Sequence, residues 1–230
     1  MQEKTLTGGR SYYLDIARAI AIISISLNHA VNRTYDNYFG QMEEFLESSY
    51  LSSLLKSVAT VFSHLGVPLF LMISGALLPA LNSLLVLRDI PPMDTAVYLF
   101  NLCSIYYLYV FTGYFISQGG LQRLRTGEVA VLTVLLFALI CGYQLYAYSD
   151  WVDYLVDYDF PLLLLCAMGL LELLRRGAEH LRGLRPVVTY LAKISFGIYF
   201  VHILIMSLLY WHMDFSEWSH LWTLLFLEGV

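Results

Sequence analysis

The stretch SVATVFSHLGVPLFLMISGALLPALNSLLVL, residues 57–87, indicates the fold class more clearly than any other part of the chain. It contains no Asp, Glu, Lys or Arg over 31 consecutive positions. A helix needs about 20 mostly apolar residues to cross the hydrocarbon core of a membrane. This stretch is long enough to do so, and we expect a membrane-spanning helix here.

Similar windows occur on both sides of this stretch. Three of them are also free of charge: Thr95–Gln122, Val129–Ser149 and Ile194–Met213. Two weaker candidates are Leu14–Val31, which has Arg18 near its start, and Phe160–Leu174, which contains Glu172; a last apolar run, Trp218–Leu227, is too short to span. The sequence therefore predicts an all-α, polytopic transmembrane helix bundle of about six passes plus a C-terminal stub, in one domain over residues 1–230.

The composition agrees with this fold class and excludes several others. Only 13% of the 230 residues are charged and 58% are hydrophobic, whereas about a quarter of a soluble globular chain is charged. An ordinary soluble enzyme and a disordered chain are thereby excluded. The net charge of −5, without a basic stripe, argues against nucleic acid as a partner. Cys103, Cys141 and Cys166 lie in apolar runs at no metal-ligand spacing, so we expect buried thiols and no metal site.

The charges between the windows orient the bundle, because short cytoplasmic loops collect Lys and Arg. Two segments are acidic: Asn32–Lys56 has two basic and four acidic residues, and Asp150–Asp159 has four Asp and no basic residue. The turn with Arg123 and Arg125 and the segment Arg175–Arg185 are basic. We therefore expect the N-terminus and both basic segments in the cytoplasm, with the acidic segments outside.

This orientation conflicts with the number of windows. It requires an even number of passes between Lys4 and Arg123, but the apolar windows provide three. The interval 80–96 contains Arg88, Asp89, Asp94 and two prolines, so it is not an ordinary membrane helix. Either the charge rule fails repeatedly, or the chain lacks a helix around residues 80–96. We also expect the C-terminal helix to be missing, because the last apolar run ends with the chain at Val230.

Ionisable side chains inside a membrane helix are costly and are functional candidates for that reason. The first pass contains Asp15, Arg18 and His29. Asp15 and Arg18 are three positions apart and pair on one helix face. Arg18 and His29 are eleven positions apart, about 16 Å along the same face. The alternative is that Arg18 extends to the inner interface and His29 to the outer headgroups, with no further role.

Two later segments also place polar or small residues inside a pass. Pro68 frees a backbone carbonyl, and Ser74-Gly75 permits close approach of another helix, for which simple packing is the competing explanation. Ser195, Tyr199 and His202 follow one another at helical spacing and form a polar stripe. A hydrogen-bonded intramembrane histidine without a function is the alternative there.

At these segments the sequence resembles acyltransferase family 3. The stretches that carry the resemblance are YYLDIARAIAIISISLNH (12–29), GVPLFLMISGALLP (66–79), IYYLYVFTGYFIS (105–117) and KISFGIYFVHILI (193–205), in the family's order. The branch with the strongest resemblance contains the enterobacterial common antigen O-acetyltransferase. Members are bacterial multi-pass enzymes that acylate cell-surface polysaccharides.

The resemblance implies a role for each candidate residue. The family's pattern of Arg or Lys, ten residues, then His falls on Arg18 and His29. His29 would then be catalytic, as a general base or a transient acyl carrier, and Arg18, paired with Asp15, would hold an acyl-CoA donor. Ser74 and Gly75 would shape the reaction site. Tyr199 and His202 match the family's late motif.

The chain also departs from the family pattern. Members usually have further helices and a basic cluster soon after the Ser-Gly motif, whereas Arg88 is the only basic residue that follows here before the next window. His64 stands where the family often has Arg. The departures begin in the interval where the loop charges indicate a missing helix.

We therefore expect a membrane O-acyltransferase of the bacterial plasma (inner) membrane. It would move an acetyl group from acetyl-CoA to a hydroxyl of an envelope glycan or lipid-linked sugar, surrounded by membrane lipids and without a bound cofactor. The competing hypotheses are a catalytically degenerate relative, an accessory component of glycan export, and a transporter, because polar stripes also mark substrate paths. Asp15, Arg18 and His29 together favour the enzyme, and the missing helix favours the alternatives.

Overall fold

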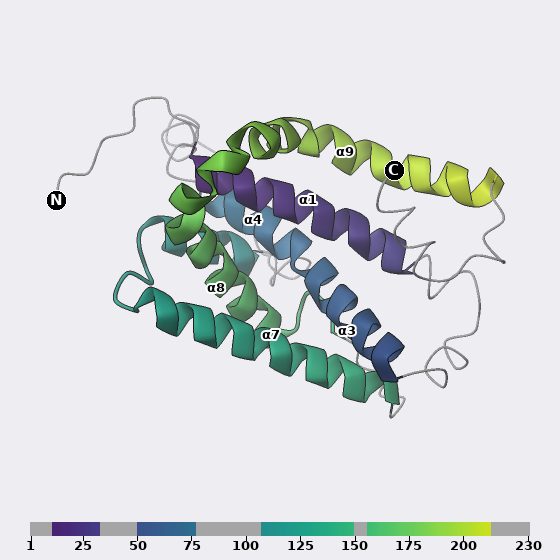
Figure 1. The fold of residues 1–230 in the computed structure, drawn as a ribbon, viewed down its shortest axis with the longest axis horizontal. Helices are drawn as coiled ribbons and strands as arrows, with labels where there is room; N and C mark the ends of the chain where they lie inside the picture. Colours follow the sequence, from purple (N-terminus) through teal and green to yellow (C-terminus); the bar gives the residue numbers. More distant parts are fainter. Residues whose placement is uncertain (1–10, 33–49, 77–106, 150–155, 213–230) are drawn as a thin grey trace, which may run out of the picture.

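A computed structural model describes residues 11–32, 50–76, 107–149 and 156–212, and all regular secondary structure in these ranges is helical (Figure 1). The helices are α1 (Tyr12–Asn32), α3 (Tyr50–His64), α4 (Gly66–Ala76), α7 (Thr126–Ser149), α8 (Pro161–Gly177), the 3-10 helix η2 (Ala178–Leu184) and α9 (Arg185–His212). Residues 107–117 are helical as well.

Within the part of the chain that the structure describes, three helical segments are long and apolar enough to cross a membrane: Tyr12–Val31, Ser53–Ala76 and Thr126–Tyr148. α7 presents a row of large apolar side chains outward, including Val131, Val134 and Leu135, each at least 60% exposed. Burying such a row in lipid removes it from water. The prediction of an all-α helical membrane protein is confirmed. The interval 80–96, Cys103 and the run Trp218–Leu227 lie outside the described residues.

The second predicted pass starts earlier than its charge-free window indicates and is broken in the middle. The prediction placed its start at Ser57, but α3 begins at Tyr50 and includes Lys56. Lys56 is only 2% exposed, and its Nζ lies over the Tyr148 ring at 4.6 Å from the centroid. The contact of an ammonium with an aromatic face is favourable. A charged residue inside the pass therefore concealed about two helical turns from the sequence analysis.

The break between α3 and α4 lies at Leu65, three residues before Pro68. Proline has no N–H to donate to the carbonyl of His64, and its ring clashes with that carbonyl in a regular helix. Gly66 allows the broken segment to contact α1, because a Cβ at this position would lie 2.8 Å from the Ala21 carbonyl oxygen. α1 and the α3–α4 pair are thus in close backbone contact.

α1 lies between α9 on one side and α3, α4 and α8 on the other (Figure 1). α1 and α9 run side by side in the same direction. The Arg185 guanidinium lies over the Tyr12 ring, 5.6 Å from the centroid, and the His29 and His202 rings are 5.0 Å apart. Each helix advances 17 residues between these two contacts, so α1 and α9 keep one register along most of their lengths.

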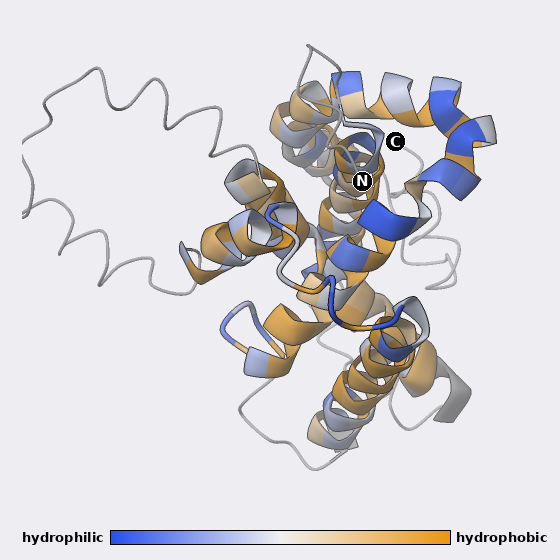
Figure 2. Ribbon diagram, turned by 90° about the vertical axis from the view of Figure 1, so that its left-hand side faces the viewer, coloured by the Kyte–Doolittle hydropathy of each residue, from blue (hydrophilic) through white to orange (hydrophobic). Residues whose placement is uncertain are grey.

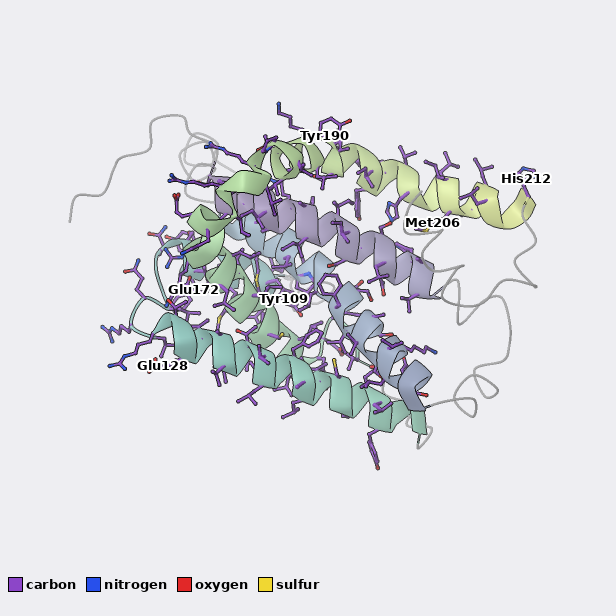
Figure 3. The ribbon with its side chains drawn as sticks, viewed as in Figure 1. Tyr109, Glu128, Glu172, Tyr190, Met206 and His212 are labelled. Carbon is purple, nitrogen blue, oxygen red and sulfur yellow. The ribbon has the colours of Figure 1, made fainter. Side chains whose placement is uncertain are left out.

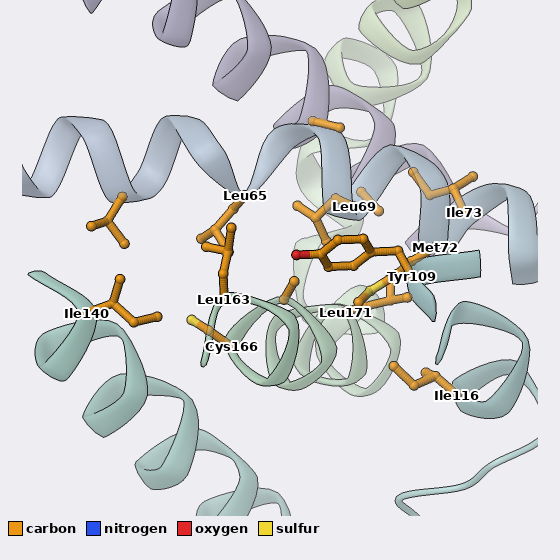
Figure 4. Packing of buried hydrophobic residues seen from close by; sticks show 14 of the residues in the cluster. Leu65, Leu69, Met72, Ile73, Tyr109, Ile116, Ile140, Leu163, Cys166 and Leu171 are labelled. Atoms are coloured by element: carbon orange, nitrogen blue, oxygen red, sulfur yellow. The ribbon is translucent and has the colours of Figure 1, made fainter. Parts of the chain in front are cut away.

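The buried core involves α1, α3, α4, α7, α8 and the helical residues 107–117, and Figure 4 shows part of it around α4 and α8. Tyr109 is fully buried there, next to Leu69 and Met72 of α4 and Leu171 of α8. Its hydroxyl donates to the Tyr158 carbonyl at 2.7 Å. A buried phenol needs such a partner, and this bond ties residues 107–117 to the segment that precedes α8.

The charged side chains gather at one end of the bundle. At this end, the Tyr12 hydroxyl donates to the Leu181 carbonyl at 2.7 Å, which joins the start of α1 to η2. The start of α1, the turn before α7, the end of α8, η2 and the start of α9 meet here and carry Arg18, Arg123, Arg125, Arg175, Arg176, Arg182 and Arg185. Figure 2 looks at the molecule from this side and shows hydrophilic residues nearest the viewer, with mostly hydrophobic colour along the helices behind them. We call it the basic end. Asp157 and Asp159 flank Tyr158, whose hydroxyl accepts from Asn28 near the other end of α1.

Glu172 is the centre of an ionic cluster at the basic end (Figure 3). Its carboxylate is fully buried and accepts two bonds of 2.8 Å from Nε and Nη2 of Arg175, and a third from Nε of Arg176. The Nη2 group of Arg176 also donates to the Leu121 carbonyl at 2.7 Å. The cluster therefore joins α8 to the turn before α7. Glu172, the acid within the apolar window Phe160–Leu174, is paired with two arginines of its own helix.

Replacing the buried acid should cost much more than replacing an exposed one. We expect Glu172→Gln to lower the free energy of unfolding by about 3 kcal/mol, the lower end for a broken buried ion pair, because the Arg175 and Arg176 side chains keep 25% and 16% exposure. The matched control is Glu179→Gln, whose pair with Arg182 is about two-thirds exposed and worth less than about 1 kcal/mol. Unfolding in mixed micelles, followed by tryptophan fluorescence, measures both. Equal losses would contradict the anchoring role of Glu172.

Candidate functional site

His29 and His202 lie side by side in the half of the bundle away from the basic end. Their ring centroids are 5.0 Å apart and the rings are tilted by 52°. His29 is half-buried on α1, whereas His202 on α9 is only 6% exposed. The fixed register of α1 and α9 places the two imidazoles at the same depth. The structure thus joins residues that are 173 positions apart in the sequence.

Aromatic contacts extend this pair toward α4. The Tyr199 ring lies 6.0 Å from that of His202 and stacks on Phe70 at 6.0 Å. Ser74 lies one turn beyond Phe70, is exposed, and donates from Oγ to the Phe70 carbonyl at 3.2 Å. Among the described residues, Phe70 and Tyr199 link Ser74 to the histidines.

Asp15 and Arg18 form the predicted pair on α1. Arg18 donates from Nη1 to Oδ1 of Asp15 at 2.9 Å. The Asp15 side chain is 3% exposed and that of Arg18 is 23% exposed. The eleven residues from Arg18 to His29 span about 16 Å of helix. The pair therefore lies near the basic end, three turns from the histidines.

Gly75 lies at a helix crossing. A Cβ at Gly75 would meet the Val110 backbone, and one at Gly113 would meet the Met72 backbone. Only residues without a side chain allow two backbones to approach so closely. Packing against residues 107–117 accounts for this glycine, and a role of Ser74 and Gly75 in shaping the reaction site stays a prediction.

A second polar cluster was missed by the sequence analysis. Ser63 donates to Oδ1 of Asn28 at 3.1 Å, and Nδ2 of Asn28 donates to the Tyr158 hydroxyl at 3.3 Å. The His64 ring lies 5.3 Å from that of Tyr158, and its Nδ1 lies 2.7 Å from the Thr60 carbonyl oxygen. The signal was the run of small polar residues on α3 at positions 53, 57, 60 and 63, which recur at helical spacing.

This second cluster is on the other side of α1 from the two histidines. Asn28 faces α3, while its neighbour His29 faces α9. Successive residues of a helix point about 100° apart, so adjacent positions serve different neighbours. α1 therefore carries polar contacts on two faces at the same depth.

The family model for an acyltransferase domain, that of acyltransferase family 3, matches residues 11–95 and 81–227. These two pieces include all the polar residues described above. The chain belongs to acyltransferase family 3. No curated protein and no solved structure is similar enough to the chain to count as a match.

Membership of acyltransferase family 3 makes the chain a membrane protein with an acyltransferase domain. Within the described residues, no three His, Cys, Asp or Glu side chains are grouped closely enough to hold a metal ion. Cys141 and Cys166 are buried, free thiols. Histidine is thus the residue type at the family motifs that offers acid–base chemistry near neutral pH.

One open groove of about 460 Å³ lies near the basic end of α9, lined by Arg185, Pro186, Thr189, Tyr190 and Lys193. Lys193 is nine residues before His202, which turns the helix by about 180° between them. The groove therefore opens on the opposite side of α9 from His202. It is not continuous with the histidines.

The glycine crossing gives a stability prediction for this acyltransferase domain. We expect Gly75→Ala and Gly113→Ala each to lower the free energy of unfolding by about 1–3 kcal/mol, because the neighbouring backbone must move. Gly142→Ala on α7 is the control, since no atom lies within 4 Å of a Cβ there, and its better helix propensity should be neutral or add up to about 1 kcal/mol. Unfolding in mixed micelles distinguishes them. Similar behaviour of all three variants would refute the crossing.

Proposed function

We propose that this protein transfers an acetyl group from acetyl-CoA to a hydroxyl of an envelope glycan or lipid-linked sugar, as in the branch of the family that contains the enterobacterial common antigen O-acetyltransferase. The observation that carries the proposal is the position of His29: a half-buried imidazole beside His202, on the same helix as the Asp15–Arg18 pair. This arrangement supports a general base at the depth of His29 and a binding site for the acyl donor at the depth of Arg18.

The chemistry requires one base. As the acceptor hydroxyl oxygen attacks the thioester carbonyl carbon, His29 takes the hydroxyl proton. The carbon–sulfur bond breaks with its electron pair on the sulfur of coenzyme A, and His29 returns the proton to that sulfur. Imidazole suits both steps, because its unperturbed pKa lies near neutral pH.

The spacing along α1 supports the assignment of the donor. Arg18 keeps part of its guanidinium exposed while bound to Asp15, and guanidinium groups bind phosphate oxygens well. A chain of the length of the pantetheine arm, equivalent to about five extended residues, spans roughly 17 Å. The helix between Arg18 and His29 covers about 16 Å. An acetyl-CoA whose phosphates lie at Arg18 would therefore bring its thioester to His29.

We further propose that the basic end faces the cytoplasm of a bacterium and that the chain lies in its plasma (inner) membrane. Loops rich in Arg and Lys stay on the cytoplasmic side, and the basic end holds the start of α1, the turn before α7 and the segment from Arg175 to Arg185. A donor made in the cytoplasm would then meet Arg18 first.

A degenerate or accessory protein of glycan export is the second candidate. The family model matches in two pieces that overlap at residues 81–95, and the family's basic cluster after the Ser-Gly motif is absent there. If the donor site lacks the residues that the family has in this segment, the bundle would have no acyltransferase activity. Membranes incubated with radioactive acetyl-CoA distinguish the two candidates, because only the enzyme labels glycan.

In that assay, His29→Ala should lower acetyl transfer by about 10²- to 10⁴-fold, the usual contribution of a general base. Arg18→Ala should instead raise the acetyl-CoA concentration needed for half-maximal rate by about tenfold or more, the loss of one charged hydrogen bond. His212→Ala, at the exposed end of α9, is the control and should keep full activity. Full activity of the His29→Ala variant would overturn the assignment.

The orientation has its own test. In a chain whose three native cysteines are replaced by alanine, Leu124→Cys lies at the basic end and Asp157→Cys at the opposite end, both exposed. A membrane-impermeant maleimide should label position 157 in intact cells, and position 124 only after the membrane is opened. Labelling of position 124 in intact cells, with 157 protected, would reverse the orientation.

A further inference from the structure

We propose that His202 is a positioning residue for His29: its Nε2 accepts a hydrogen bond from His29 when His29 takes the acceptor's proton. The inference rests on the proposed function and adds to it a second residue and the atom through which it acts. His202 touches neither donor nor acceptor in this scheme and acts only through His29.

The first observation is that α9 fixes the tautomer of His202. Its Nδ1 lies 3.0 Å from the Ile198 carbonyl oxygen, one turn earlier on the same helix. A carbonyl oxygen only accepts, so Nδ1 carries the proton. In the neutral ring Nε2 is then the nitrogen with the lone pair, and it is an acceptor.

The second observation is that this acceptor is buried without a partner. His202 is 94% buried, and its Nε2 has no hydrogen-bond partner among the described residues. Buried polar atoms are nearly always paired, because an unpaired one costs free energy. An unpaired buried nitrogen at a family motif is expected where the hydrogen bond to that nitrogen forms only during the reaction.

The third observation is that His29 is at the distance such a bond requires. Two imidazoles joined by an N–H···N bond of ordinary length have centroids about 5 Å apart, the bond plus two ring radii. The observed separation is 5.0 Å with a tilt of 52°. The parallel register of α1 and α9 holds both rings at this depth, so a rotation of the His29 side chain is the movement needed.

The elements packed around the two histidines carry the following titratable or charged groups among the described residues. On α9 the nearest titratable residue is Tyr199, 6.0 Å from His202. α4 contributes the Phe70 ring and has no charged residue. Across α1, His64 and Lys56 belong to α3, which contacts the opposite face at Asn28. Asp15 and Arg18 are three turns away.

The proposed step moves one proton and no further charge. The acceptor O–H proton passes to one ring nitrogen of His29, while the N–H on the other nitrogen points to Nε2 of His202. The resulting imidazolium is stabilised by that bond. When the thiolate of coenzyme A takes the proton, His29 is neutral again and His202 is unchanged throughout.

Kinetics of two variants test the role. His202→Phe keeps a ring but has no acceptor, so kcat should fall about 10²-fold while the KM values for acetyl-CoA and acceptor stay within about threefold. The acid limb of the pH–rate profile should move to lower pH, because protonated His29 loses its stabilising partner. His202→Gln keeps a carbonyl acceptor and should recover part of kcat. Met206→Leu, one turn away on the buried side of α9 (Figure 3), controls for packing and should leave kcat unchanged.

A chemical measurement tests the same inference without acetyl transfer. Diethyl pyrocarbonate modifies the unprotonated imidazole, and peptide mass spectrometry resolves the modification of His29 from that of the other five histidines. The pH midpoint of His29 modification should fall by about one unit in His202→Phe, a tenfold change in proton affinity, and stay constant in Met206→Leu.

The outcomes separate this inference from the proposed function. If the wild-type chain transfers no acetyl group, the proposed function fails, while the modification midpoint still decides whether His202 acts on His29. An unmoved midpoint overturns the inference even if kcat falls. Equal losses in the Phe and Gln variants with an unmoved acid limb would assign His202 to packing alone.

Discussion

The parallel packing of α1 against α9 is the contact on which the candidate site depends. Two contacts 17 residues apart, Tyr12 with Arg185 and His29 with His202, keep the same register. A membrane offers no water to unpaired polar groups, so polar side chains on these helices need partners at their own depth. A shift of either helix by one turn would move one histidine about 5 Å along the helix axis relative to the other. The register therefore determines which motif residues meet.

The opposite face of α1 is held by backbone proximity. Pro68 breaks the second pass at Leu65, and Gly66 brings that break against Ala21 and Ile25. Small residues supply much of the association energy of membrane helices, because lipid removes the hydrophobic driving force between them. α4 is in turn fixed by the crossing of Gly75 with residues 107–117. α1 thus has fixed contacts with α9 on one face and with the α3–α4 break on another. These contacts hold the His29 side chain at a defined position.

The sequence predicted the helical class and the Asp15–Arg18 pair, because each depends on residues close together in the chain. For Pro68 it indicated only a freed backbone carbonyl, and the break at Leu65 is a finding of the structure. The sequence analysis missed the contact of Asn28 with Ser63 and Tyr158, since that cluster unites three segments and the helical spacing of small polar residues on α3 does not identify their partners. Lys56 misled the analysis about where the second pass starts, because a charge normally ends an apolar window and here an aromatic ring covers it. Glu172 weakened the fifth window for the same reason, although its two arginines follow within four residues.

If His202 acts on His29 as proposed, a histidine stands where soluble enzymes often place a carboxylate, and the low dielectric of the membrane gives a physical reason. The charged form of a buried acid is expensive in low dielectric unless cations surround it, as Arg175 and Arg176 surround Glu172 at the basic end. Around the His29–His202 pair the structure describes the Tyr199 and Phe70 rings, and Arg18 lies about three turns away. A neutral imidazole offers the same acceptor at far lower desolvation cost and only has to be held in one tautomer, which the Ile198 carbonyl does. The buried carboxylates of Asp15 and Glu172 thus pair with arginines near the basic end, whereas the histidine pair lies about three turns from Arg18.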